Sequence, residues 1–157
     1  MKGETFFLKF AVILMGLPVI ALCIYGLPWL TNNPINSDYA YIIYPILIGM
    51  YVSAIPFYIA LYSAFRLLGY IDQNIAFSEL SVRTLKHIKY CAIAISTLYV
   101  IIMPFTYLLA EKDDAPGLII FGTVPVFASI VIAVFAAVLQ KLLKNAIDIK
   151  NDNDLTI

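Results

Sequence analysis

The chain has 157 residues, of which 62% are hydrophobic, and its mean hydropathy is +0.92. A soluble domain contains roughly 45–50% apolar residues, so a water-soluble core of one domain could not bury so much apolar side chain. The formal net charge is zero and only 13% of residues are charged, which argues against direct binding of nucleic acid, since phosphate binding requires a concentrated basic surface. The composition therefore predicts a membrane protein, with the lipid bilayer as the solvent for most of the chain.

The first apolar stretch covers about residues 6–30 and carries no charge after Lys9. About 20 helical residues are enough to cross the hydrocarbon of a bilayer. A signal peptide is the alternative, but the stretch is longer than a usual signal-peptide core, and Pro28-Trp29-Leu30 is a poor cleavage site. We therefore expect a retained span that is kinked at Pro18 unless a neighbouring group satisfies the freed carbonyl.

The second span, about residues 39–68, is unusually rich in aromatic residues. Four of these residues share one helix face, because they follow seven-, four- and three-residue spacing. They are Tyr51, Tyr58, Tyr62 and Phe65. Packing against a neighbouring helix is the simpler explanation, and a bundle-lining or ligand-binding role for the three tyrosines is the alternative. Tyrosine hydroxyls in lipid need hydrogen-bond partners, which serine side chains or backbone carbonyls could supply.

Residues 66–89 form the only long polar run between the apolar blocks, with two spans before it and two after it. Ser78 is predicted to cap a helix that has Glu79 in its first turn, and Phe77 can pack against Val82 inside that helix. Apolar residues then recur at helical spacing, with basic residues on the other face. This segment therefore predicts an amphipathic juxtamembrane turn that continues into the third span.

The third and fourth spans cover about residues 90–110 and 118–140. The fourth span contains small residues that permit close approach of a neighbouring helix. They are Gly122, Ala128, Ser129, Ala133, Ala136 and Ala137. The four spans predict an all-α fold, a four-transmembrane-helix bundle that either closes or leaves a groove facing the lipid. Residues 1–150 would form this membrane domain, and residues 151–157 a C-terminal tail that is either solvated or docked on a partner.

The basic residues are distributed unevenly around the four spans. Lys112 alone lies between the third and fourth spans, whereas the other nine of the ten lie near the N-terminus, in residues 66–89 or after the fourth span. The positive-inside rule therefore places both termini and residues 66–89 in the cytoplasm. Four bases of the central segment could also bind anionic headgroups, although setting the topology is a sufficient role for them. They are Arg66, Arg83, Lys86 and Lys89.

The sequence contains no glycine-rich phosphate loop, no Cys or His cluster and no nucleophile–base pair. We therefore expect a non-enzymatic protein without a metal or cofactor. Cys23 and Cys91 lie in apolar runs, where a role as small packing residues is expected. His87 is expected to be a solvated residue, with a pH sensor as the alternative. Residues 10–65, 90–110 and 118–140 contain no charged residue apart from Asp38, which lies in the loop between the first two spans. This absence of charges within the membrane argues against a pump or secondary transporter, but less strongly against a passive pore in a homo-oligomer.

Two segments together resemble a known family. The first is Asp72-Gln73-Asn74-Ile75-Ala76-Phe77-Ser78 followed by residues 82–88, which reads as a short polar linker, Phe-Ser and a basic helix. The second is residues 146–157, which end in Asn-Asp-Leu-Thr-Ile. Both are similar to the bacterial four-span membrane family known as domain of unknown function 2975, over nearly the whole chain. That family tends to have a Gly and a Pro just before the Phe, where this chain has Asn74-Ile75-Ala76.

The resemblance implies little about activity, because none is established for that family. Its genes often lie beside a very short helix-turn-helix regulator, so the chain looks like the membrane half of a sensor–regulator pair. The implied docking surface combines the central segment with the C-terminal tail. Its residues would be Phe77, Ser78, Arg83, Asp154, Leu155, Thr156 and Ile157. The alternative function is permeation of a small molecule or ion, or immunity against membrane-active agents, through the tyrosine-rich second span.

Overall fold

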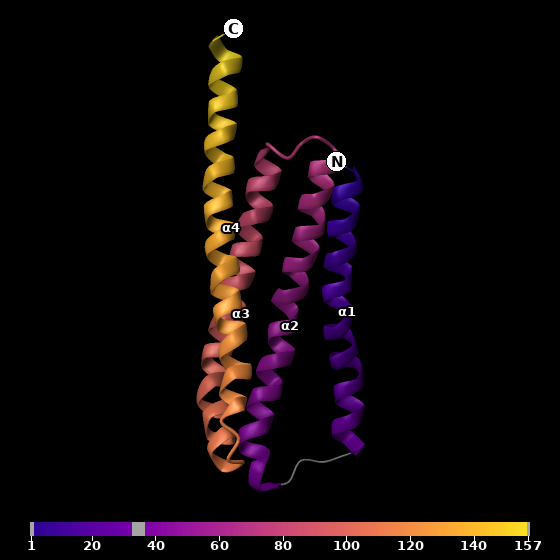
Figure 1. The fold of residues 1–157 in the computed structure, drawn as a ribbon, viewed down its shortest axis with the longest axis vertical. Helices are drawn as coiled ribbons and strands as arrows, with labels where there is room; N and C mark the ends of the chain where they lie inside the picture. Colours follow the sequence, from indigo (N-terminus) through magenta and orange to yellow (C-terminus); the bar gives the residue numbers. More distant parts are fainter. Residues whose placement is uncertain (1, 33–36, 157) are drawn as a thin grey trace.

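The computed structural model describes residues 2–32 and 37–156, and within these ranges it contains helices and no β-strand. The helices are α1 (Lys2–Asn32), α2 (Ser37–Asp72), α3 (Glu79–Lys112) and α4 (Gly117–Thr156) (Figure 1). Each contains an apolar stretch long enough to cross a bilayer. Helices suit such a chain because lipid offers no hydrogen bonds, so the backbone must satisfy its own polar groups. The predicted all-α fold of four transmembrane helices is confirmed.

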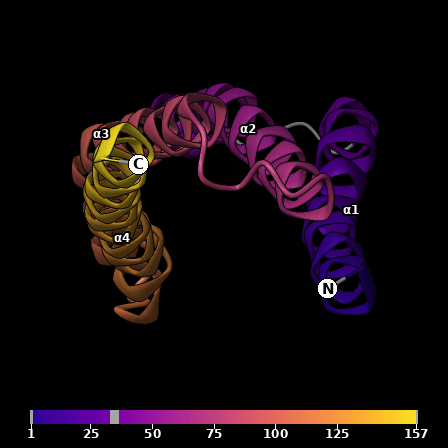
Figure 2. The same cartoon turned by 90° about the horizontal axis from the view of Figure 1, so that it is seen from above.

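In the described part of the chain, successive helices run antiparallel and each packs only on its neighbours in sequence. Among the described residues, α1 contacts α2, α2 contacts α3 and α3 contacts α4, while α1 and α4 do not meet. Seen from above, the four helices therefore form an open arc with α1 and α4 at its two ends (Figure 2). Of the two arrangements that the sequence left open, a closed bundle and a groove facing the lipid, the structure has the second.

Small residues allow α3 and α4 to approach closely. A Cβ atom added at Gly122 would lie 2.6 Å from the Sδ atom of Met103, so a larger residue could not occupy this position without a shift. Ser129 and Ala136, at seven-residue spacing from Gly122, are also buried. The prediction that small residues of the fourth span pack against a neighbour is confirmed at these positions, whereas Ala128 is exposed.

The start of α3 follows the predicted pattern with one difference. Ser78 is the N-cap residue and has an extended backbone, with φ −140° and ψ 162°. Its hydroxyl makes no capping bond and instead donates to the carbonyl oxygen of Ile75 at 2.6 Å. Val82 and Leu85 are buried while Arg83 is exposed, so the predicted amphipathic turn is confirmed.

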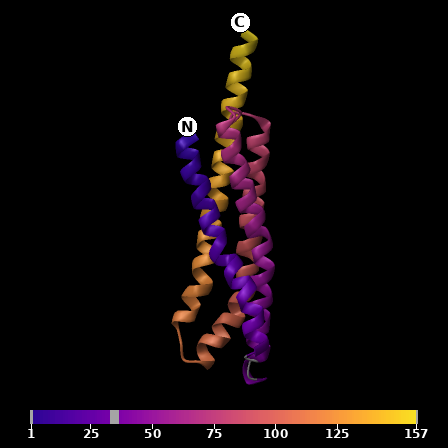
Figure 3. The same ribbon diagram turned by 90° about the vertical axis from the view of Figure 1, so that its right-hand side faces the viewer.

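Both chain ends and the α2–α3 loop lie at the same end of the molecule (Figure 1). We call this the basic end, comprising the start of α1, residues 66–89 and the last turns of α4. Helix α4 is 40 residues long and projects from this end beyond the other three helices (Figure 3). Residues 151–156, expected to form a separate tail, continue α4 as helix, and Ile157 lies outside the described residues.

Candidate functional site

Two tyrosine hydroxyls of α2 hold α1 in place. Tyr58 Oη donates a hydrogen bond to the carbonyl oxygen of Gly16 at 2.9 Å, and Tyr51 Oη donates to the carbonyl oxygen of Cys23 at 3.4 Å. Serine side chains and backbone carbonyls were both expected as partners of these hydroxyls, and the structure has backbone carbonyls. A Cβ atom added at Gly26 would lie 2.6 Å from Tyr51 Oη, so the missing side chain at this position makes room for the tyrosine. Because α1 contacts no other helix in the described structure, these bonds bear directly on its position.

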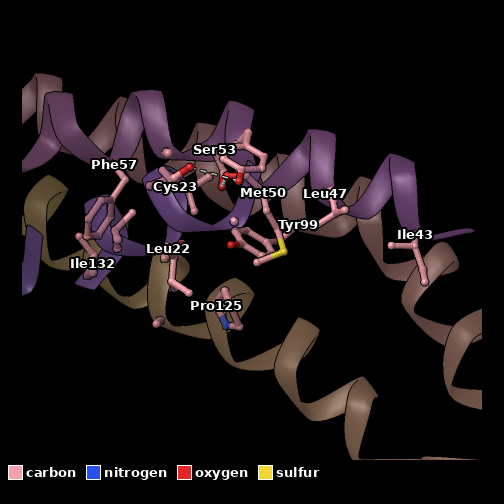
Figure 4. A pocket seen from close by; sticks show the side chains of 17 residues that line it. Leu22, Cys23, Ile43, Leu47, Met50, Ser53, Phe57, Tyr99, Pro125 and Ile132 are labelled. Carbon is pink, nitrogen blue, oxygen red and sulfur yellow. Dashed lines mark hydrogen bonds between the residues drawn. The ribbon is translucent and has the colours of Figure 1, made fainter. Parts of the chain in front are cut away.

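A groove with a volume of about 630 Å³ lies on the concave side of the arc and is lined by residues of all four helices. Leu22 comes from α1, Met50 from α2, Tyr99 from α3 and Pro125 from α4 (Figure 4). This volume lies within the roughly 300–1,000 Å³ range of small-molecule sites. Because α1 and α4 do not contact each other among the described residues, the groove is open between them.

The lining of the groove is almost entirely apolar. Of its few polar groups, the Ser53 hydroxyl donates to the backbone carbonyl of Met50 in its own helix, at 2.7 Å. Tyr51 and Tyr99 add a hydroxyl each from α2 and α3. Such a surface suits a hydrocarbon chain or another apolar molecule. An ion, in contrast, would find few groups to replace its hydration shell.

The tyrosine stripe of the second span does not act as one unit. Tyr51 lines the groove, and Tyr58 reaches toward α1. Tyr62 is 63% exposed, and its ring centroid lies 5.8 Å from the Arg66 guanidinium carbon. Phe65, the fourth member, lies 5.4 Å from the Lys9 ammonium. The structure therefore brings the hydroxyls of Tyr51 and Tyr58 to α1, and of the four residues only Tyr51 lines the groove.

Asp72 connects the beginning of α1 to the end of α2 at the basic end. Lys9 Nζ lies 2.9 Å from Asp72 Oδ2, and the Thr5 hydroxyl donates to Asp72 Oδ1. Thr5 and Lys9 are four residues apart and therefore lie on one face of α1. This cluster was not among the functional residues predicted from the sequence. The only indication of it in the sequence was that Asp72, at the end of the second span, lies at the same membrane depth as the Thr5 hydroxyl and the Lys9 ammonium.

Cation–aromatic contacts mark both ends of the molecule. At the basic end, Arg66 also lies over Tyr70 at 5.7 Å, and Lys89 lies over Tyr90 at 4.9 Å. At the opposite end, the Lys112 ammonium lies 4.6 Å from the Tyr39 ring centroid. Aromatic and basic side chains commonly anchor helices at the two membrane–water interfaces, and these contacts are typical of such anchors.

The predicted docking residues are distributed over the basic end. Phe77 is 60% exposed in the α2–α3 loop, the side chain of Arg83 is exposed, and Ser78 is half-buried with its hydroxyl on Ile75. The backbone of residues 154–156 belongs to α4. The side chains of Asp154, Leu155 and Thr156 lie outside the described part of the structure, as does the whole of Ile157. The structure thus brings both predicted segments to one end of the molecule, with α4 extending past the loop.

Other candidate chemistry is limited. Within residues 2–32 and 37–156, no group of three or more His, Cys, Asp or Glu side chains is placed to hold a metal ion. Cys23 in α1 and Cys91 in α3 are free thiols. His87 is exposed on the basic face of α3. The open groove and the basic end are therefore the two features on which a function can be argued.

Comparison with known proteins identifies the family. Residues 29–157 match the family model described as "Protein of unknown function (DUF2975)". The chain belongs to this family. It is also 61% identical over 158 residues to "Uncharacterized membrane protein YoaS" of Bacillus subtilis (strain 168), with 99% of each chain covered. No solved structure matches. The protein is therefore a multi-pass integral membrane protein of a bacterial family, as its four apolar helices indicate.

Proposed function

We propose that the protein is a non-enzymatic sensor and interaction module of the bacterial membrane. Its basic end faces the cytoplasm and docks a small partner protein, such as a helix-turn-helix regulator. Residues 66–89 and the end of α4 form the docking surface. The observation that carries this proposal is the projection of α4 beyond the other helices at the end where the α2–α3 loop also lies (Figure 3).

The α2–α3 loop supports the proposal because it presents an unusual side chain. Phe77 is 60% exposed in a short polar loop, flanked by the basic first turns of α3. Exposed aromatic residues are favoured anchors at protein interfaces, because burying one ring removes a large apolar area from water. The neighbouring exposed bases Arg83 and Lys86 would favour an acidic partner surface.

The groove supplies the sensing part of the proposal. A molecule that enters it would contact all four helices, including the two ends of the arc that do not touch each other. A ligand shifts a conformational equilibrium only when it binds one state better than another. The arc would have two states, an open one and one narrowed around an apolar ligand that binds it better. Narrowing would move α4 relative to the α2–α3 loop.

Co-purification of the full-length protein from bacterial membranes tests the docking surface. Deleting residues 154–157 in one variant and introducing Phe77→Ala in another should each abolish recovery of the partner. Phe121→Ala is the matched control, because Phe121 is 78% exposed but lies near the start of α4, at the opposite end. An unchanged pull-down in both variants would refute the proposed surface.

Permeation or immunity through the second span is the alternative function, and the presence of Tyr51 in the groove favours it. The apolar lining would suit a small apolar molecule better than an ion. Flux across proteoliposomes that falls in Tyr51→Phe would support this function. Flux equal to that of empty liposomes would exclude it.

A further inference from the structure

Helix α4 carries an apolar face that its own chain leaves uncovered. Along this face apolar residues alternate at three- and four-residue spacing, which is the a and d pattern of a coiled coil. We call this set the α4 seam; it consists of Ile132, Phe135, Leu139, Leu142, Ala146 and Ile149. All of them except Ala146 are 50–64% exposed. The side of α4 that packs on α3 is different and includes the buried Ser129, Ala136 and Ile147.

The last part of the seam extends beyond the membrane. A helix of 40 residues is about 60 Å long, roughly twice the thickness of the hydrocarbon core. Exposed Lys141 and Lys144 mark the level at which α4 leaves the hydrocarbon. Leu142 and Ile149 follow Lys141 and are nevertheless 59% and 62% exposed. Lipid tails can cover Ile132 and Phe135, but they cannot cover Ile149.

The chain's own helices do not cover Ile149 either: it is 62% exposed, although Ile147, two residues earlier on the side that packs on α3, is buried. An occupant that covers the whole seam must itself cross the membrane–water boundary. A lipid cannot follow the seam into the water, and a soluble partner cannot follow it down to Ile132. A second α4 can do both, because it has the same apolar face at every depth.

We propose that the α4 seam pairs with the α4 seam of a second copy of this chain. Copies inserted in one membrane with the same topology present their α4 helices in parallel, as a two-stranded coiled coil about a two-fold axis requires. In this pattern Ile132, Leu139 and Ala146 are a positions, and Phe135, Leu142 and Ile149 are d positions. The next a position is Asn153, and a single asparagine at an a position favours one register and oligomeric state. Ile132 also lines the groove, so the second helix would lie beside the groove's open side.

Cysteine crosslinking in native membranes tests the dimer. Two copies of the full-length chain carrying different tags are co-expressed, with Cys23 and Cys91 replaced by alanine and one new cysteine introduced. A disulfide forms only when the two Cα atoms approach within about 7 Å. Leu142→Cys and Ile149→Cys, both at d positions, should join the two tags. Lys144→Cys, at the outermost f position of the same helix, is the matched control and should give at least several-fold less product.

Equal crosslinking at all three positions, no crosslinking at the d positions, or a disulfide to a protein other than the second copy would overturn the dimer. A second measurement is the mass of the protein in nanodiscs. Leu142→Asp with Ile149→Asp should convert the dimer to a monomer, whereas Lys144→Asp should leave the dimer intact. The crosslinking requires no regulator, and the pull-down with Phe77→Ala leaves the seam unchanged, so the dimer and the proposed function can fail separately.

Discussion

The hydrogen bond from Tyr58 to Gly16 offers a direct test of how α1 is held in the arc. Tyr58→Phe removes only the hydroxyl that donates to the Gly16 carbonyl oxygen at 2.9 Å. Hydrogen bonds between helices in membranes average about 0.6 kcal/mol and reach about 1.7 kcal/mol, which corresponds to a roughly 3- to 20-fold change in an equilibrium constant. Tyr51→Phe should cost less than Tyr58→Phe, because the bond from Tyr51 to the Cys23 carbonyl is longer, at 3.4 Å.

The assay is the free energy of unfolding of the full-length protein in lipid or mild detergent. Tyr62→Phe is the matched control: Tyr62 is in the same helix, is 63% exposed, and finds no hydrogen-bond acceptor for its hydroxyl among the described residues. We expect stability to decrease in the order Tyr62→Phe, Tyr51→Phe, Tyr58→Phe. A loss for Tyr62→Phe equal to that for Tyr58→Phe would refute the assignment of the Tyr58 bond to α1.

Two further substitutions test other contacts that hold α1. Gly26→Ala should destabilise the protein because the new Cβ atom would lie 2.6 Å from Tyr51 Oη; Tyr51→Phe should relieve most of this loss, and simple addition of the two losses would contradict the predicted contact. Asp72→Ala should lower thermal stability by roughly 0.2–1 kcal/mol, the usual value for a partly exposed ion pair, and the loss should shrink at high salt, where the pair with Lys9 is screened. Asp72→Ala with no effect at low salt would show that this pair does not hold α1.

The number of helices, and the length of apolar sequence that lets each of them cross a bilayer, could be predicted from the sequence because hydropathy acts locally. Apolar runs of sufficient length form helices in lipid wherever they occur, and this also explains why Pro18 and Pro56 lie inside helices without ending them. The gathering of both termini at one end follows from an even number of spans. The amphipathic start of α3 was predictable for the same reason, since its spacing depends only on neighbouring residues.

Features that depend on distant residues could not be predicted. Lys9 and Asp72 are 63 residues apart, and no sequence pattern relates them. The open arc depends on whether α1 packs on α4, which composition does not determine because lipid can cover either helix. The Asn- and Asp-rich residues 151–156 favour a solvated end, yet they continue α4. Extending an existing helix costs much less than nucleating a new one, which explains the difference.

The location of the basic end in the cytoplasm is the assumption on which the proposed docking surface rests. Labelling with a membrane-impermeant thiol reagent tests it in cells that carry a chain without Cys23 and Cys91. Asp148→Cys, exposed near the end of α4, should react only after the cells are permeabilised, whereas Asp113→Cys, exposed between α3 and α4, should react in intact cells. Labelling of Asp148→Cys in intact cells, with Asp113→Cys protected, would place the basic end outside the cell and contradict a cytoplasmic partner.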